Sequence, residues 1–252
     1  MDLQLTGKVA LVTGASVGLG RVIAKLLAAE GCHIAVLARR TALLDLLADE
    51  IAASGAQRPL VITQDICAPG AAERVHRQVF DRFARCDILV NNAGASHPIT
   101  GLGTDEEWEQ SMLLNFSAGR RLAHAFVGDM QKNRFGRIIN LTGSDEPLAL
   151  NSANPPNGAV HIWAKALSRK VAKDNVTVNS IPPGRIHSEQ IDTRIMPTPE
   201  SQQTWVAEHC PAGYVGEPED LAVLVVFLSS PRARYINGQV IHVDGSVRRS
   251  PH

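Results

Sequence analysis

The sequence predicts an α/β protein built on a doubly wound, parallel sheet of about seven strands flanked by helices. Short apolar runs alternate with helical patterns from one end of the chain to the other, which is the order of repeated strand–helix–strand units. Most of these runs are continuously apolar, as expected for parallel strands that helices cover on both faces. A glycine-rich turn after the first run marks the usual ligand-binding edge of such a sheet.

The elements follow one another in a regular order. The expected strands are Val9–Thr13, His33–Ala38, Leu60–Thr63, Ile88–Asn91, Arg137–Leu141, Thr177–Ile181 and Gln239–Val243. The expected helices lie at about Gly20–Glu30, Leu43–Ala53, Ala71–Phe83, Asp105–Gln131, Val160–Asp174 and Pro218–Leu228.

Two stretches rich in helix- and strand-breaking residues stand apart as loops, Asp145–Gly158 and Pro182–Pro211. Both leave from the carboxyl ends of expected strands. Ligands bind beyond those ends in an open α/β sheet. We therefore expect the two loops to form the walls of a substrate site.

Length and charge restrict the function. At 252 residues the chain is expected to form one domain, residues 1–252. Its 25 acidic and 25 basic residues balance, so no nucleic-acid or anionic-membrane partner is expected. No apolar run has transmembrane length and no signal-peptide pattern opens the chain. The basic C-terminal tail, residues 247–252, is expected to fray.

The four cysteines have neither pairing nor metal-ligand spacing. Reduced cysteines are typical of the cytoplasm, and we expect a cytoplasmic protein. A zinc site built from His161, His187 and His209 has no short ligand spacing to support it, so no metal is expected.

The motif Thr13–Gly20 reads Thr-Gly-Ala-Ser-Val-Gly-Leu-Gly and joins the first strand to the first helix. Glycines at this spacing allow a tight turn and a close approach to a pyrophosphate, while the helix N-terminus offers its N–H groups to the anion. A glycine triplet alone also occurs in ordinary strand-to-helix turns. The strand–turn–helix context favours a dinucleotide site.

Basic residues close the second strand, at Arg39 and Arg40. A carboxylate near this point would hold the ribose 2′-hydroxyl of NAD, whereas arginine suits the 2′-phosphate of NADP. The alternative is a solvated basic pair at a helix start. Asp65 follows the third strand. It either accepts a hydrogen bond from the adenine of a cofactor or caps a helix.

Taken together, the motifs resemble the short-chain dehydrogenase/reductase superfamily over nearly the whole chain, in a branch similar to the 3-oxoacyl-(acyl carrier protein) reductases. The resemblance implies a Rossmann-type fold, a nicotinamide cofactor, a small-molecule substrate and a homo-oligomer, tetramer or dimer. It rests on Thr13–Gly20, Asp65, Asn91–Gly94, Asn115, Lys165, Val178–Asn179, Pro183–Gly184, Gly216–Pro218 and Val243–Gly245.

The same resemblance assigns the cofactor site. Within the superfamily Arg39 marks a preference for NADP(H), and NAD(H) is the less favoured cofactor. The implied cofactor-binding residues are Gly14, Ser16, Gly18, Leu19, Gly20, Arg39, Arg40, Asp65, Ile66, Asn92, Gly94, Lys165, Pro183, Gly184, Ile186 and Ser188.

The catalytic positions depart from the family pattern. The family's Tyr-x-x-x-Lys motif corresponds to His161–Lys165, so that His161 stands in place of tyrosine. An ungapped match places Gly143 on the catalytic serine, with Thr142 and Ser144 beside it. Either Ser144 takes the role of the serine after a small shift from the ungapped match, or no residue takes this role.

Replacement of tyrosine by histidine changes the chemistry expected of the site. His161 and Lys165 are four residues apart and share a helix face. A lysine cation favours a neutral imidazole, which suits a base near neutral pH better than a strong acid. Imidazole is also shorter than phenol, so that substrate must sit deeper or a water must bridge. The alternative is that His161 is a helix-face residue in a degenerate site.

Three functional hypotheses follow. The leading one is an NADP(H)-dependent oxidoreductase that interconverts a carbonyl and an alcohol on a small organic substrate. There, Lys165 fixes the ribose and tunes His161, Asn115 holds a proton-relaying water, and Ser144, with Thr142, polarises the substrate oxygen. The second is a lyase, dehydratase or decarboxylase that uses His161 as a base without hydride transfer. The third is a catalytically silent, cofactor-binding regulatory protein.

Other polar residues of the two loops are weaker candidates. Asp145 and Glu146 follow Ser144, where a carboxylate could orient His161, although a solvated loop is the simpler interpretation. His187, Glu189, His209 and Trp205 lie in or near the second loop and form either a lid over substrate or ordinary surface.

Overall fold

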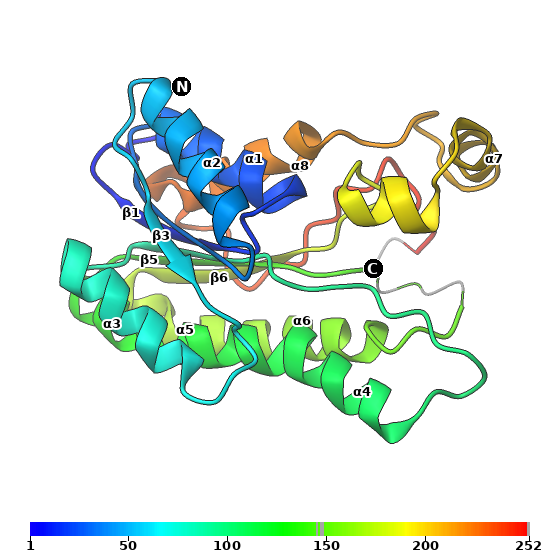
Figure 1. Cartoon of the computed structure of the whole chain (residues 1–252). Helices are drawn as coiled ribbons and strands as arrows, with labels where there is room; N and C mark the ends of the chain where they lie inside the picture. The colour runs from blue at the N-terminus through cyan, green and yellow to red at the C-terminus, as the bar shows by residue number, and fades with distance from the viewer. Residues whose placement is uncertain (145, 147–148, 251–252) are drawn as a thin grey trace.

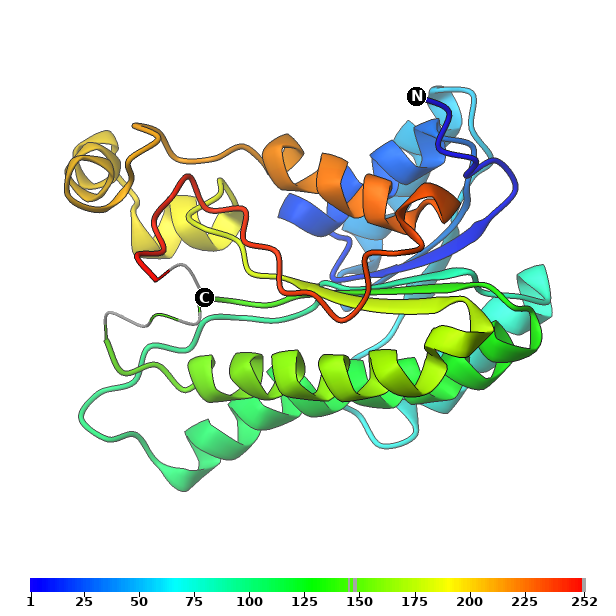
Figure 2. The ribbon, with the colours of Figure 1, turned by 180° about the vertical axis from the view of Figure 1, so that it is seen from behind.

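The computed structural model describes residues 1–144, 146 and 149–250 and contains three layers (Figure 1). A parallel sheet of order β3-β2-β1-β4-β5-β6 lies in the middle. Helices α1, α2 and α8 cover one face, and α3, α5 and α6 cover the other, as both views show (Figures 1 and 2). The strands are β1 (Val9–Thr13), β2 (His33–Ala38), β3 (Leu60–Thr63), β4 (Ile88–Asn91), β5 (Gly136–Leu141) and β6 (Val176–Ile181).

The helices follow the predicted order, with two short helices on the loop side of the sheet. Among the described residues no helix has the length and apolarity needed to cross a membrane. The α-helices are α1 (Gly18–Ala29), α2 (Thr41–Ala53), α3 (Ala71–Phe83), α4 (Asp105–Met112), α5 (Gly119–Lys132), α6 (Asn154–Val171), α7 (Pro199–His209) and α8 (Pro218–Ser229).

The parallel, doubly wound α/β prediction is confirmed. All five residues of β1 and all six of β6 are buried, because helices cover both faces of these strands. Two apolar clusters result, one between the sheet and α1, α2 and α8, the other between the sheet and α3, α5 and α6. The strand order reverses direction at β1 and β4, so that the switch point where such sheets bind ligands lies at their carboxyl ends.

The predicted seventh strand, Gln239–Val243, is wrong as a regular strand. The segment runs beside β6, and its backbone exchanges hydrogen bonds with Ser180. Only isolated bridges form, between Ser180 and Val240 and between Pro183 and Val243. Proline has no N–H to donate, so Pro182 and Pro183 interrupt the regular ladder.

The long helix predicted for Asp105–Gln131 is continuous but not uniform. A π-helical turn, Leu113–Ala118, separates α4 from α5. Such a turn holds one extra residue and occurs often at functional sites, because it re-aims side chains. Asn115, a predicted site residue, lies in this turn.

Helix α6 begins at Asn154, six residues before the predicted start, so that the prediction of a loop through Gly158 is wrong there. Pro155 and Pro156 occupy the first positions of the helix. Proline fits the first turn because that turn's N–H groups have no partner within the helix. The prolines therefore start a helix in this chain.

The second predicted loop, Pro182–Pro211, also contains helical structure. A π-helical turn, Ile191–Ile195, and α7 lie within it. Thr198 caps α7 through its hydroxyl, which accepts from the N–H of Ser201 at 3.2 Å. The loop is therefore a structured wall with its own small apolar cluster.

Arg137 is a fully buried arginine in β5. Its guanidinium donates to the carbonyls of Gly136, Asn175 and Ser230 at 2.8, 2.9 and 3.2 Å. Burial lowers the pKa of this guanidinium to about 10. The side chain thus ties the start of β5 to the end of α8.

We expect Arg137→Ala to lower the free energy of unfolding by about 3 kcal/mol, since it opens a cavity and leaves buried carbonyls without a donor. Urea denaturation measures this loss. Arg134→Ala is the control, because Arg134 is exposed and pairs with Asp174 at the surface, where an ion pair contributes less than about 1 kcal/mol. Equal losses in the two variants would contradict the bracing role of Arg137.

Candidate active site

A cavity of about 680 Å³ opens at the carboxyl edge of the sheet. The turns after β1, β4, β5 and β6, together with α7 and the C-terminal segment, line this edge cavity, so that chain segments far apart in sequence meet there. The predicted site residues that line it are Gly14, Gly18, Leu19, Asn92, Gly94, Asn115, Ser144, Pro183, Gly184, Ile186 and Ser188. Those that do not line it are Ser16, Gly20, Arg39, Arg40, Asp65, Ile66, His161 and Lys165.

The glycine-rich turn is packed as closely as a phosphate cradle requires. Gly14 has a φ of +64°, and a Cβ there would lie 2.8 Å from Asn92 Nδ2. A Cβ on Gly20 would lie 2.6 Å from the Gly14 carbonyl oxygen. Both positions therefore exclude a side chain, which leaves the backbone N–H groups at the start of α1 open to an anion.

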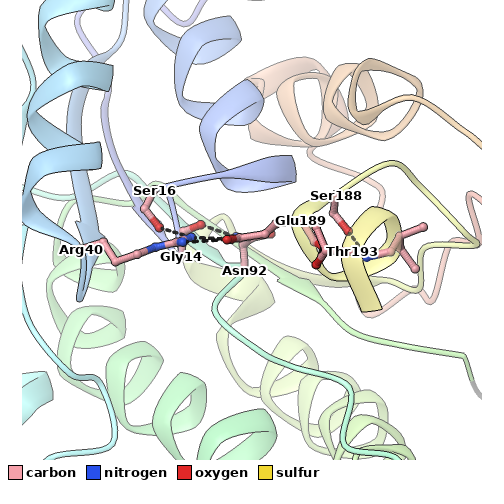
Figure 3. A network of polar contacts seen from close by, with 8 residues as sticks. Gly14, Ser16, Arg40, Asn92, Ser188, Glu189 and Thr193 are labelled. Atoms are coloured by element: carbon pink, nitrogen blue, oxygen red, sulfur yellow. Dashed lines mark hydrogen bonds and ion pairs between the residues drawn. The ribbon is translucent and has the colours of Figure 1, made fainter. Parts of the chain in front are cut away.

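Thr13 and Asn92 hold this turn against the end of β4. The Thr13 hydroxyl accepts from the backbone N–H groups of Asn92 and Ala93 at 2.9 and 3.0 Å. Asn92 Nδ2 in turn donates to the carbonyl of Thr13 at 2.9 Å. It also donates to the carbonyl of Gly14 at 3.2 Å (Figure 3). The cradle is thus fixed by the neighbouring strand before any ligand arrives.

Arg40 reaches across the open side of the cradle (Figure 3). Its guanidinium forms a two-pronged pair with Glu189 at 3.1 and 2.8 Å, and it approaches the Ser16 hydroxyl at 3.5 Å. Hydrogen bonding to Arg40 lowers the pKa of the Glu189 carboxyl. The pair links the end of β2 to the wall after β6.

Arg39 is exposed and forms no hydrogen bond or ion pair with any described residue. The pKa of the Cys67 thiol is raised by burial and by Asp65, and the charge of Arg39 acts to lower it. Arg39 therefore lies within electrostatic reach of the turn after β3. In that turn Asp65 accepts the N–H of Cys67 at 2.9 Å, while Ile66 packs into the core.

His161 does not line the edge cavity; it lies behind Thr142, which does. His161 Nε2 and Thr142 Oγ1 are 2.9 Å apart. A hydroxyl therefore stands between the imidazole and the cavity. The expectation that substrate sits deeper or that a water bridges to His161 stays a prediction.

Lys165 is not brought to the cavity either. Its side chain is exposed, and its Nζ donates to the Gly238 carbonyl at 3.1 Å. Helix α6 leads away from the cavity along the sheet, so that its later turns lie farther from the cavity than its first (Figure 2). The geometry thus gives no support to the predicted ribose contact of Lys165.

Asn157 is a cavity residue that the sequence analysis did not single out. It precedes His161 by one turn on the same face of α6. A Cβ on Gly143 would lie 2.5 Å from Asn157 Nδ2, so the amide occupies the space next to Gly143. The prolines that begin α6 are the sequence signal that could have placed this residue on the helix.

Asn115 keeps both ends of its amide within the protein. Its Oδ1 accepts the N–H of Ala95 at 3.0 Å, and its Nδ2 donates to the Ser111 hydroxyl at 3.0 Å. A Cβ on Gly94 would lie 3.0 Å from Asn115 Oδ1. The π-helical turn therefore aims Asn115 at the loop after β4 and fixes that wall of the cavity.

Ser144 lines the cavity, and its hydroxyl pairs with the backbone of Glu146 at 3.1 and 3.2 Å. Asp145, the other acidic candidate here, lies outside the described residues. Thr142 is the hydroxyl that meets His161, so that the two hydroxyls considered for the serine role have different partners.

The C-terminal tail is ordered as far as Ser250, so that the expectation of fraying is wrong there. The backbone N–H groups of Arg249 and Ser250 donate to the Glu146 carboxylate at 2.8 and 2.7 Å. Val247, Arg248 and Arg249 line the cavity as a result. A carboxylate that receives two N–H groups is the local reason for the docking.

The wall after β6 contains the remaining candidates. His187 Nδ1 lies 2.7 Å from Asp192, and Trp205 and His209 lie on α7, at the cavity. Arg185, which the sequence analysis did not single out, also lines the cavity. Within the part of the chain that the structure describes, no three His, Cys, Asp or Glu side chains are placed to hold a metal ion.

Comparisons with known proteins agree with this architecture. A family model described as Enoyl-(Acyl carrier protein) reductase matches residues 14–247. The 3-oxoacyl-(acyl-carrier-protein) reductase FabG of Vibrio cholerae is 36% identical over 97% of this chain and 99% of its own. L-sorbose reductase from Gluconobacter frateurii, solved with NADPH and L-sorbose, has a TM-score of 0.94 at 33% identity and covers 99% of this chain and 100% of its own. YwfH, an NADPH-dependent reductase involved in bacilysin biosynthesis, has a TM-score of 0.89 at 26% identity, with 97% and 100% covered.

Proposed function

The chain belongs to the short-chain dehydrogenase/reductase superfamily, in its 3-oxoacyl-(acyl carrier protein) reductase-like branch, and on that premise we propose that it is an NADP(H)-dependent oxidoreductase. The reaction is the interconversion of a carbonyl and an alcohol on a small organic substrate. Relatives over the full length of the chain are reductases, and two similar solved structures carry NADPH in their descriptions.

One observation carries the proposal. The glycine cradle, the Asn92–Gly94 turn and the Pro183–Ser188 wall line a single cavity at the switch point of the sheet. A cradle that excludes Cβ atoms at Gly14 and Gly20 fits a pyrophosphate and leaves the rest of the cavity for nicotinamide and substrate.

The reduced nicotinamide supplies a hydride, so that this chain's residues must supply the proton. The proposed donor to the substrate oxygen is the Thr142 hydroxyl, which lines the cavity. It regains its proton from Nε2–H of the His161 imidazolium, which leaves a neutral imidazole that solvent reprotonates. Asn157 is placed to orient the substrate oxygen or a water by hydrogen bonding, and Ser144 is the second hydroxyl at the site. This scheme uses His161 indirectly and gives no step to Lys165.

Arg39→Ala is expected to weaken NADPH binding about 10- to 100-fold, because a charge-assisted pair with the 2′-phosphate is lost. NADH binding should change less than about 2-fold, since NADH has no such phosphate. Fluorescence titration with each nucleotide measures both constants. Arg58→Ala is the matched control, since Arg58 is exposed, pairs with Asp45 and Asp49 and does not line the cavity. Equal losses for the two nucleotides would remove Arg39 from 2′-phosphate recognition.

The proposed function itself is tested by titrating the protein with NADPH and NADH. The absorbance of the reduced nicotinamide is then followed with a panel of ketones, β-keto esters, oxo acids and quinones. Tight NADPH binding with turnover supports the proposal. Tight binding without turnover on the panel favours a non-redox enzyme or a cofactor-binding regulator. Failure to bind either nucleotide would remove the cofactor assignment.

We also propose a cytoplasmic homo-oligomer, a dimer or tetramer. The four cysteines are free, as in a reducing compartment. Ile162 on α6 is 77% exposed and Tyr235 is fully exposed, which suits burial against a second copy. Light scattering of the purified protein measures the assembly directly.

A further inference from the structure

Arg185 is held rigidly at the mouth of the edge cavity. The N–H of Gly184 donates to Val243 at 2.8 Å, and the Arg185 carbonyl accepts the N–H of Gly216 at 2.9 Å. The backbone on both sides is therefore tied to neighbouring segments. The side chain lines the cavity, and its guanidinium lies 5.6 Å from the ring centroid of Trp205 on α7.

The charge of Arg185 has no anionic partner among the described residues. The side chain is half-buried, and burial lowers the pKa of its guanidinium. Among the described residues, its guanidinium has no hydrogen bond or ion pair and lies over the Trp205 ring. The N–H donors of a guanidinium lie in the plane of the guanidinium itself. A guanidinium over an aromatic face therefore keeps these donors available to a ligand.

The described carboxylates that line the cavity are already engaged by other groups. Glu189 pairs with Arg40, and Glu146 receives the N–H groups of the C-terminal tail. Asp244 receives the N–H groups of Ser246 and Arg248 at 3.0 and 2.9 Å. The cavity therefore presents a partly desolvated cation without a counter-charge, an arrangement that is costly unless a ligand supplies the anion.

We propose that Arg185 docks the carboxylate of the substrate, so that the substrate class is an oxo acid and its hydroxy acid. The planar guanidinium fork matches the two oxygens of a carboxylate. A singly charged carboxylate balances one cation, whereas a phosphate dianion would leave a charge uncompensated in a partly dry site. Trp205 offers an apolar face for the carbon chain.

The position of Arg185 separates it from the phosphates of a cofactor. On the same wall it is Ser188 that faces the glycine cradle, since a Cβ on Gly18 would lie 3.5 Å from Ser188 Cβ. Arg185 instead faces α7, which lies beyond the edge of the sheet and away from α1 (Figures 1 and 2). The substrate assignment rests on the proposed function, but binding of the acid can be measured without turnover.

The experiment uses the full-length protein with Trp108→Phe and Trp163→Phe, which leaves Trp205 as the one tryptophan of the three. Its fluorescence is titrated, with and without saturating NADP⁺, with 2-, 3- and 4-oxo acids, their methyl esters and inorganic phosphate. At least one acid should bind about 10- to 100-fold more tightly than its ester, as one charge-assisted pair provides.

Arg185→Gln should remove this preference, and Arg185→Lys should restore it in part because the charge returns without the fork. Arg194→Gln, at an exposed residue outside the cavity, controls for net charge.

Equal binding of every acid and its ester would overturn the proposal, as would an unchanged acid preference in Arg185→Gln. Binding of phosphate in place of the acids would overturn the carboxylate assignment. If Arg185→Gln weakens acid and ester alike, Arg185 is only structural. Acid binding that depends on Arg185 but occurs without NADPH oxidation would contradict the redox function and support the carboxylate assignment. If NADPH is oxidised with the esters as fast as with the acids, the redox function is supported and the carboxylate assignment is contradicted.

Discussion

Gly20→Ala is expected to weaken NADPH binding by at least about 100-fold, equivalent to losing two charge-assisted hydrogen bonds to the pyrophosphate. The new Cβ would lie 2.6 Å from the Gly14 carbonyl and 2.5 Å from Asn92 Nδ2. Neither group can yield easily, because Asn92 Nδ2 is bonded to Thr13 and Gly14. The turn must therefore shift, and its N–H groups move away from the anion. Isothermal titration with NADPH measures the loss.

Helix propensity alone would make Gly20→Ala stabilising, so a loss of NADPH binding in this variant points to the cradle. Gly20 lies within α1, where alanine would ordinarily stabilise a helix by about 1 kcal/mol relative to glycine. Gly128→Ala in α5 is the matched control, because a Cβ there meets nothing within 4 Å. The control should leave NADPH binding unchanged and raise the melting temperature. Unchanged NADPH binding in Gly20→Ala would contradict the cradle.

Thr142→Val is expected to lower kcat about 100- to 10,000-fold, the usual contribution of a positioned proton donor. NADPH affinity should stay within about 2-fold, because valine keeps the shape of threonine and removes only the hydroxyl. The hydroxyl of Thr142, which lines the cavity, lies 2.9 Å from His161 Nε2. Steady-state kinetics on the best substrate of the panel, together with NADPH titration, measures both quantities.

The comparison with His161→Ala decides how the histidine acts. If proton transfer passes through Thr142, the double variant should be hardly slower than either single one, because the two residues act as a unit. Lys165→Met is the control and should retain near-normal kcat, since its Nζ lies on Gly238. Full activity in Thr142→Val with none in His161→Ala would show that His161 reaches the substrate directly. Loss of activity in Lys165→Met would restore the lysine to the mechanism.

Several residues that line the edge cavity could be predicted one by one because their positions depend on local sequence. A strand, a glycine turn and a helix start are consecutive in Val9–Ala29, and the backbone geometry of that unit is set within it. Asn92 and Pro183 follow strands whose apolar runs are plain in the sequence. Parallel strands place their carboxyl ends on one edge, so these turns had to converge.

The residues expected to act in acid–base chemistry, His161 and Lys165, could not be placed in this way, because their position depends on where α6 begins. A motif spacing assigns His161 and Lys165 to one helix face but leaves open which turn of that face meets the cavity. Pro155 and Pro156 start the helix at Asn154, so that Asn157 takes the first cavity-facing position and His161 lies one turn deeper. The hydroxyl of Thr142, in the turn directly after β5, lies 2.9 Å from His161 Nε2.

The sequence by itself determined the α/β class, the parallel order of strands and the phosphate cradle, because periodicity, glycine spacing and strand ends are local properties of the chain. Only the tertiary structure decided the partners of the charged groups. Glu189 meets Arg40, Glu146 binds the tail, and Arg185 lies over an aromatic ring with no anion among the described residues. Ion pairing and desolvation depend on which distant segments meet, and the sequence does not display those distances.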